Sequence, residues 1–136
     1  MKKNLKIPFA RPVINIDKTI NLIKGVLKKN FPNEGEFTKN FEKKISSLLK
    51  TKYAITSTSG TSAIFLALKA INVMPEDEIL VPNITFPATA NAVKLTGAKV
   101  VLVDVNKKNL LISMDDLKKK ISKKTKAIIP VHISGR

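Results

Sequence analysis

The sequence contains no cysteine and a single histidine, His132. The lack of cysteine excludes a disulfide framework and any cysteine-based zinc or redox site. One histidine excludes a metal site built from several histidines, so we expect no metal centre. Aromatic residues are also few, with no tryptophan and one tyrosine.

Long apolar runs are missing too. No uninterrupted stretch approaches the roughly 20 apolar residues that span a bilayer, and the start Met1-Lys2-Lys3-Asn4 is not followed by the apolar core of a signal peptide. We therefore expect no membrane insertion and a cytoplasmic protein. The remaining composition, 43% hydrophobic and 26% charged over 136 residues, is typical of one globular domain or part of one.

The net charge of +15 is carried almost entirely by lysine, because only two of the 25 basic residues are arginines. Nucleic-acid recognition favours arginine forks and stacking aromatic side chains, and both are scarce here. Lysine runs such as residues 118–120 and 123–124 fall on the polar faces of expected helices. We therefore interpret the lysines as a solvated surface and expect no nucleic-acid partner.

Apolar periodicity predicts alternating helices and strands. Residues 1–14 carry Pro8 and Pro12, which favour an extended arm. After this arm, the pattern predicts helices over residues 17–29, 38–50, 61–72, 88–96 and 113–121, and strands over residues 53–56, 78–81, 99–103 and 126–131. Such alternation implies a mostly parallel sheet covered on both faces, so the expected fold class is three-layer α/β/α.

Several single residues are expected to shape these elements. Asp17 and Ser113 are candidate N-caps, and Ile71 is expected on the buried face of its helix. The carboxyl ends of parallel strands meet at one edge of a sheet, where ligands bind. The polar and aromatic residues at these ends are Ser57, Ser59, Gly60, Thr61, Asn83, Thr85, Phe86, Asp104 and His132.

The segment Ser57-Thr58-Ser59-Gly60-Thr61-Ser62, here called the phosphate cradle, turns from an apolar run into a strongly helical stretch. The first N–H groups of a helix lack intrahelical acceptors and lie at the positive end of its dipole. Glycine allows close approach of the backbone, and the hydroxyls add donors. The segment therefore predicts an anion site. Ordinary N-cap chemistry, with Ser59 or Thr61 as the cap, is the alternative that it leaves open.

A series of further stretches accompanies the cradle: Gly35-Glu36-Phe37-Thr38-Lys39-Asn40-Phe41-Glu42, Ser59-Gly60-Thr61-Ser62-Ala63, Asp77-Glu78-Ile79-Leu80-Val81-Pro82, Thr85-Phe86-Pro87-Ala88-Thr89-Ala90-Asn91-Ala92, Gly97-Ala98, Val103-Asp104-Val105 and Thr125-Lys126-Ala127-Ile128-Ile129-Pro130-Val131-His132. Their order and spacing, from about Ile7 onward, resemble the DegT/DnrJ-type sugar aminotransferases. These are pyridoxal-phosphate enzymes of the aspartate aminotransferase fold (fold type I) that amino-functionalise nucleotide-linked keto sugars.

The resemblance implies pyridoxal 5′-phosphate as the cofactor. It implies that Ser59, Gly60, Thr61 and Ser62 bind the cofactor's phosphate, in agreement with the cradle. It also implies that the ring of Phe86 stacks on the pyridine ring, where a flat apolar face holds the ring plane. A core aromatic at a strand-to-helix turn is the alternative for Phe86.

For three other residues, the sequence leaves two possible roles open. His132 resembles the family's Pro-Val-His stretch and would line the cofactor pocket, or it is a structural histidine. Asp104 ends an apolar strand, where it caps the following turn or belongs to the site. Arg11 resembles the arm that packs near a partner subunit, or it is simply exposed.

The family's Schiff-base lysine and the carboxylate that pairs with the pyridine nitrogen match no residue of this chain. By resemblance they are expected beyond Arg136, so no catalytic residue is expected within the chain. Residues 15–136 would then be the amino-terminal part of the large PLP-binding domain, and the small carboxyl-terminal domain is absent. The resemblance thus implies an amino-terminal fragment without transaminase activity of its own, from a protein that forms a homodimer.

Three functions remain open at this stage. The first is amination of a nucleotide-linked keto sugar, with glutamate as the donor, in nucleotide-sugar and surface-polysaccharide biosynthesis. The second is PLP-dependent sugar dehydration, in which a histidine replaces the family's lysine. The third is a non-catalytic module that binds phosphate or nucleotide.

Overall fold

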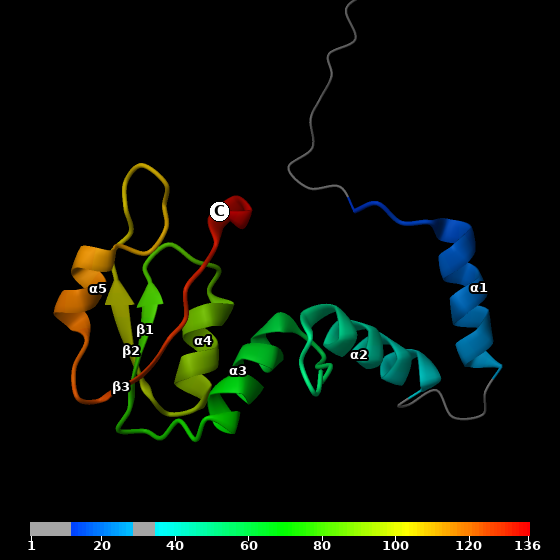
Figure 1. The fold of residues 1–136 in the computed structure, drawn as a ribbon, viewed down its shortest axis with the longest axis horizontal. Coiled ribbons are helices and arrows are strands. Elements are labelled where there is room, and N and C mark those ends of the chain that lie inside the picture. The colour runs from blue at the N-terminus through cyan, green and yellow to red at the C-terminus, as the bar shows by residue number, and fades with distance from the viewer. Residues whose placement is uncertain (1–11, 29–34) are drawn as a thin grey trace, which may run out of the picture. The chain divides into compact units, whose positions relative to one another are not determined.

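The structure is a computed structural model that describes residues 12–28 and 35–136 (Figure 1). The chain divides into two compact units between Ile55 and Thr56. The first unit contains α1 (Ile16–Leu27) and α2 (Glu36–Leu49), and the second contains α3 (Gly60–Ala70), β1 (Glu78–Pro82), α4 (Ala88–Leu95), β2 (Lys99–Val103), α5 (Met114–Lys120), β3 (Thr125–Ile128) and the short 3-10 helix η1 (Ile133–Gly135). The expected arm falls mostly outside the described residues, and Arg11 lies there too.

Helices α1 and α2 are amphipathic, and neither contains a buried residue. The cap of α1 is Asn15, whose side-chain oxygen accepts a hydrogen bond from the Lys18 N–H at 3.0 Å. The expectation that Asp17 is the cap is therefore wrong. Asp17 lies in the first helical turn instead, where a negative charge suits the helix dipole. No helix among residues 12–28 and 35–136 is long and apolar enough to cross a membrane.

The strand expected over residues 53–56 does not form, and this prediction is wrong. None of these residues pairs with a strand of the described sheet, and the side chain of Ile55 is 84% exposed. The run Tyr53-Ala54-Ile55 has strand-like composition, but no strand of the described residues pairs with it. A short apolar run without such a neighbour does not become a strand.

The second unit is built on a three-stranded parallel sheet with the order β2-β1-β3. β1 is the central strand, where Ile79 lies opposite Val100 of β2 and Ala127 of β3. Parallel strands require crossover connections, and here each connection carries a helix. The predicted alternation of helices and parallel strands is confirmed.

The two faces of β1 are covered by different helices (Figure 1). Successive side chains of a strand point to opposite faces. Ile79 and Val81 pack in one cluster with residues of α3 and α4, and Leu80 packs in a second cluster with Leu117 of α5. The three β1 side chains are fully buried. The sheet therefore lies between two helical layers, as the predicted α/β/α class requires.

Helix α3 ends earlier than expected, and Ile71 is exposed rather than buried. Asn72 adopts a left-handed backbone, with φ of 54°, and donates its N–H to the Lys69 carbonyl. The Val73 N–H reaches back to the Leu68 carbonyl at 3.1 Å. This pair of bonds is a Schellman-type helix end. It turns Val73, instead of Ile71, into the core.

β2 is less buried than the central strand, and β3 is shorter than predicted. β2 has the predicted bounds but lies at the sheet edge, so that Leu102 is 54% exposed. β3 ends at Ile128 instead of residue 131. Ile129 still donates its N–H to the Leu80 carbonyl at 2.9 Å, but the next bond of the ladder would need an N–H from Pro82 of β1, which proline lacks.

Glu78 is expected to make the stability of the second unit sensitive to acid. Its carboxylate accepts hydrogen bonds from Lys99 Nζ at 2.9 Å and Ser122 Oγ at 2.7 Å. These bonds, led by that from Lys99, lower the pKa of Glu78 below its ordinary value of 4.5. A lowered pKa contributes stability that is complete above the unfolded-state pKa and is lost as the pH falls through the folded-state pKa.

Urea unfolding at a series of pH values tests this expectation. The free energy of unfolding should fall below pH about 4.5, and Glu78→Gln should make that fall shallower. Glu76→Gln, in the exposed turn before β1, is the matched control and should keep the parent slope. An identical acid slope in the parent chain and Glu78→Gln would contradict the role of Glu78.

Candidate functional site

The phosphate cradle lies at the amino end of α3, and its hydroxyl groups converge there. Ser59 is the N-cap, and its Oγ accepts a hydrogen bond from the Ser62 N–H at 3.2 Å. Ser62 Oγ lies 3.0 Å from Ser59 Oγ and 3.3 Å from Thr58 Oγ1. The capping alternative for Ser59 is therefore confirmed, but capping uses only one of the open N–H groups of the helix.

Two backbone donors of the cradle have no acceptor among residues 12–28 and 35–136. Among the described residues, none accepts a hydrogen bond from the N–H of Gly60 or Thr61. A Cβ built on Gly60 would meet nothing within 4 Å, and Gly60 does not adopt a positive φ. Neither packing nor backbone geometry therefore requires glycine at this position. The open space and two free donors suit an anion with several oxygen atoms.

Phe86 lies in the loop between β1 and α4 with its side chain 78% exposed. Phe86 is therefore not part of the core that the described residues form. The loop is fixed next to Phe86, because Thr85 Oγ1 lies 2.8 Å from Thr89 Oγ1 and the Thr89 N–H bonds the Phe86 carbonyl at 3.1 Å. An exposed aromatic ring on a fixed loop can offer a flat apolar face to a ligand.

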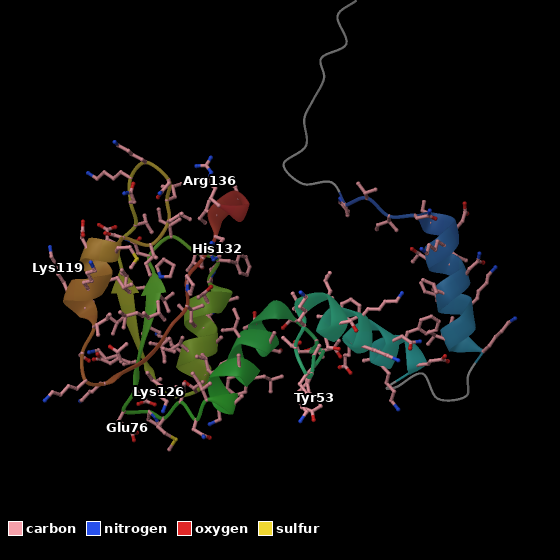
Figure 2. All side chains as sticks on the ribbon, in the orientation of Figure 1. Tyr53, Glu76, Lys119, Lys126, His132 and Arg136 are labelled. Atoms are coloured by element: carbon pink, nitrogen blue, oxygen red, sulfur yellow. The ribbon has the colours of Figure 1, made fainter. Side chains whose placement is uncertain are left out.

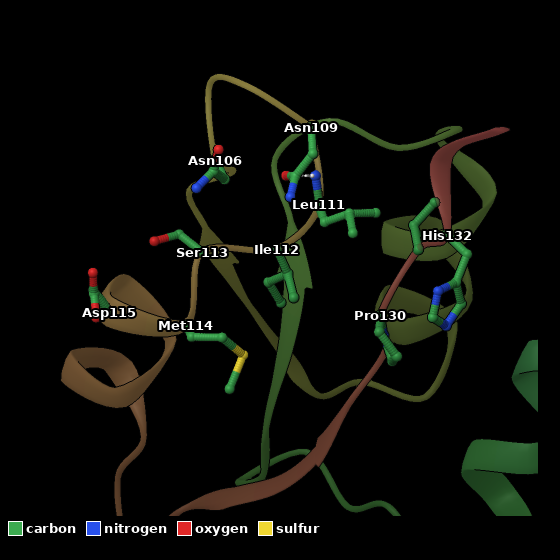
Figure 3. A pocket seen from close by; sticks show the side chains of 10 residues that line it. Asn106, Asn109, Leu111, Ile112, Ser113, Met114, Asp115, Pro130 and His132 are labelled. Carbon is green, nitrogen blue, oxygen red and sulfur yellow. Dashed lines mark hydrogen bonds between the residues drawn. The ribbon is translucent and has the colours of Figure 1, made fainter. Parts of the chain in front are cut away.

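His132 follows β3 and borders a pocket of about 390 Å³ (Figure 3). Its Nδ1 lies 2.7 Å from the Arg136 backbone oxygen (Figure 2). The other residues that line the pocket come from the loop after β2, the start of α5 and the chain after β3; they are Asn106, Asn109, Leu111, Ile112, Ser113, Met114, Asp115, Pro130 and Val131. No cradle residue lines this pocket. Within the described chain, His132 makes no hydrogen bond to Phe86 or to the cradle.

Asp104 caps the turn that follows β2, which is one of the two roles expected for it. Its Oδ1 accepts hydrogen bonds from the Val105 N–H at 2.8 Å and from Asn83 Nδ2 at 3.2 Å. Its backbone N–H donates to Asp116 Oδ2 at 2.7 Å. This last bond, followed by the one from Lys120, lowers the pKa of Asp116 below its ordinary value of 3.8.

The sequence pattern identified the residues at the strand ends but not this chain of bonds. Asn83 and Asp104 were both expected at the ligand edge of the sheet, and the structure brings them into contact. Asp116 lies in the first turn of α5. The bond from Asp104 links it to the strand ends as well. Within residues 12–28 and 35–136, no group of three histidine, cysteine or acidic side chains is placed to hold a metal ion.

The sequence profile of the DegT/DnrJ/EryC1/StrS aminotransferase family matches residues 14–136. The chain belongs to this family. Two curated relatives come from Bacillus subtilis (strain 168). The spore coat polysaccharide biosynthesis protein SpsC is 33% identical over 99% of this chain and 34% of its own length. The 3-oxo-glucose-6-phosphate:glutamate aminotransferase is 35% identical over 96% of this chain and 31% of its own length.

Solved structures of similar sequence share the fold. Spr1654 from Streptococcus pneumoniae, in its PLP form, superposes with a TM-score of 0.89 at 32% identity, over 95% of this chain and 33% of that protein. A GDP-4-keto-6-deoxymannose-3-dehydratase with a trapped PLP-glutamate geminal diamine gives a TM-score of 0.83 at 28% identity, over 93% of this chain and 34% of that protein. The family and the fold class predicted from the motifs are therefore confirmed. The chain spans about a third of the length of the relatives that it matches.

Proposed function

We propose that the protein carrying this chain is a pyridoxal-phosphate-dependent aminotransferase. Its substrate would be a nucleotide-linked keto sugar, and its amino donor would be glutamate. The protein would act in nucleotide-sugar and surface-polysaccharide biosynthesis. The observation that carries the proposal is the open amino end of α3, where two N–H donors face no acceptor in the described chain and a cluster of hydroxyls lies beside them. Membership of an aminotransferase family supports pyridoxal phosphate as the occupant of this proposed anion site.

The residues present fit the cofactor. We assign its phosphate to Ser59, Gly60, Thr61 and Ser62, because a phosphate dianion matches the helix dipole and accepts several hydrogen bonds. We assign the ring contact to Phe86, since its exposed face has no partner of its own in the second unit. When bound, this cofactor supplies an electron-withdrawing ring and a carbon that exchanges amino groups.

The part played by this chain is binding and orientation. The cradle fixes one end of the cofactor, and Phe86 restricts the plane of the ring, so that the bond to be broken can be aligned with the ring system. His132 is proposed to line the edge of the same site. We assign proton transfer to no residue of this chain.

Sugar dehydration is the second candidate function. The observation that favours it is the likeness to the GDP-4-keto-6-deoxymannose-3-dehydratase. Because the cradle and Phe86 serve binding, they are compatible with both reactions. The two candidates differ at the lysine-or-histidine position that the family resemblance places outside this chain.

We further propose a homodimer that works in the cytoplasm. Helices α1 and α2 carry exposed apolar residues and bury none within their own unit, which is typical of surfaces covered by a partner. Glutamate and nucleotide-activated sugars, the proposed substrates, are cytoplasmic metabolites. Light scattering of the complete protein should give twice the mass of one chain.

Expression of the complete coding region tests the proposed function. We expect a protein with bound cofactor that transfers the nitrogen of isotopically labelled glutamate to a 4-keto sugar nucleotide, as mass spectrometry would detect. A sugar product without nitrogen and with one oxygen fewer would favour dehydration. A protein that binds nucleotide or phosphate but retains no cofactor would overturn both in favour of a non-catalytic module.

A further inference from the structure

The exposed ring of Phe86 is not positioned by packing. With 78% of the side chain accessible, the ring makes few contacts that could fix it. Its position must therefore come from the backbone of the loop between β1 and α4. That loop has an attachment on each side of Phe86.

The attachment after Phe86 joins the loop to α4. Thr85 Oγ1 lies 2.8 Å from Thr89 Oγ1, and Thr89 is buried in α4. The Thr89 N–H also bonds the Phe86 carbonyl at 3.1 Å. This side of the loop is thus anchored by neighbours in sequence.

The attachment before Phe86 joins the loop to the end of β2. The Asn83 N–H donates to the Val103 carbonyl at 2.8 Å, and Asn83 Nδ2 donates to Asp104 Oδ1 at 3.2 Å. The backbone bond holds the first residue of the loop against the end of β2. The side-chain bond fixes the direction in which the loop leaves β1, because it acts sideways across the two strands.

Asp104 is itself held by α5, on the opposite face of the sheet from α3 and α4. Its N–H donates to Asp116 Oδ2 at 2.7 Å, and its carbonyl accepts the Ser113 N–H at 2.8 Å. Lys120 Nζ donates both to Asp116 Oδ2 at 2.7 Å and to the Leu102 carbonyl at 2.8 Å. The carboxylate of Asp116 is therefore held between a backbone donor and a cation, in one orientation.

We infer that Asn83 and Asp116 are positioning residues for the ring of Phe86, acting through Asp104. This inference rests on the proposed function, in which Phe86 contacts the cofactor ring. Helix α5 thereby sets the position of a group that lies across the sheet from it. Within the described chain, the cradle at the start of α3 makes no hydrogen bond to Asn83, Asp104 or Asp116. Substitutions at these three residues should therefore leave phosphate binding at the cradle unchanged.

The test compares two probes on the protein expressed from its complete coding region. Pyridoxamine 5′-phosphate reaches both the cradle and Phe86 and has no aldehyde to react with surface lysines. Inorganic phosphate reaches the cradle alone. Asn83→Ala should weaken binding of pyridoxamine 5′-phosphate roughly 3- to 10-fold, the size expected for one lost hydrogen bond, and leave inorganic phosphate unchanged.

Variants of α5 extend the test. Asp116→Ala should weaken binding of pyridoxamine 5′-phosphate, and Asp116→Asn should restore part of it, because the amide oxygen can still accept from the Asp104 N–H. Lys119→Gln is the matched control, since Lys119 lies on the same helix and points away from the sheet (Figure 2). It should bind both probes like the parent protein.

A double-mutant cycle separates positioning from general stability. In a Phe86→Ala background, Asn83→Ala should cause no further loss of affinity for pyridoxamine 5′-phosphate. Additive losses, or equal losses for both probes, would overturn the inference. If Phe86→Ala weakens binding but Asn83→Ala does not, the inference fails alone. If Phe86→Ala has no effect, the ring contact in the proposed function fails, and the inference falls with it.

Discussion

Replacing Ile79 with alanine is expected to lower the free energy of unfolding of the second unit by about 2–5 kcal/mol. Ile79 is fully buried at the centre of β1 and packs with Leu68, Val73 and Val93. The substitution removes apolar contacts from both helices on that face and leaves a cavity that the sheet backbone can only partly close. Urea unfolding followed by circular dichroism measures the loss.

Leu102→Ala is the matched control for this prediction. Leu102 lies on the adjacent strand β2, but its side chain is 54% exposed. Its replacement should cost less than about 1 kcal/mol, because surface substitutions create no cavity. Similar losses at the two positions would mean that the sheet is not the core of the unit.

The elements of the second unit were predictable because their signals are local. Ser59 and Ser113 both cap the helices that follow them, and each accepts a hydrogen bond from an N–H three residues ahead. β2 has the predicted bounds, and β1 extends one residue further to Pro82. A cap, a short apolar run and a following turn are all encoded within a few residues.

The failures share a different cause. Residues 53–56 have the composition of a strand but gain no neighbour in the described sheet, and Ile71 loses its buried place because Asn72 reverses the chain. β3 stops early because Pro82 of the neighbouring strand has no N–H to donate to it. In each case the outcome depended on a backbone partner that the apolar pattern does not specify.

The candidate site also contains features that the sequence predicts and features that it does not. The start of α3 and its cluster of hydroxyls could be predicted, because an apolar run, a glycine and a helix with hydroxyls are contiguous in sequence. The bonds that join Asn83, Asp104 and Asp116 could not, because they connect residues 21 and 12 positions apart. Parallel topology predicted that Asn83 and Asp104 would share an edge, but it carried no information on the side-chain bond or on α5.

Replacing Thr61 with aspartate is expected to abolish cofactor retention while leaving the fold intact. Thr61 is the second residue of α3, and its N–H is one of the two donors without an acceptor in the described chain. A carboxylate there suits the helix dipole and should stabilise the helix by about 0.3–1 kcal/mol. It would, however, face the phosphate of the cofactor.

The size of the effect follows from Coulomb's law. Two like unit charges about 4 Å apart repel by about 4 kcal/mol at an effective dielectric constant of about 20. That energy corresponds to roughly a thousandfold loss of affinity, and salt screening brings the expected loss to at least about a hundredfold. Equilibrium dialysis of the complete protein with pyridoxamine 5′-phosphate would measure it. Pyridoxamine, which lacks the phosphate, should lose much less affinity.

Two variants control for charge and for shape. Thr38→Asp places the same charge in the first turn of α2, an exposed position in the first unit, and should leave affinity unchanged. Thr61→Ser keeps the hydroxyl and should bind nearly as well as the parent protein. If Thr61→Asp retained the cofactor, or if Thr38→Asp lost it equally, the phosphate would not lie at the start of α3. Because aspartate favours the helix and opposes the phosphate, stability and affinity should move in opposite directions, which a simple folding defect cannot produce.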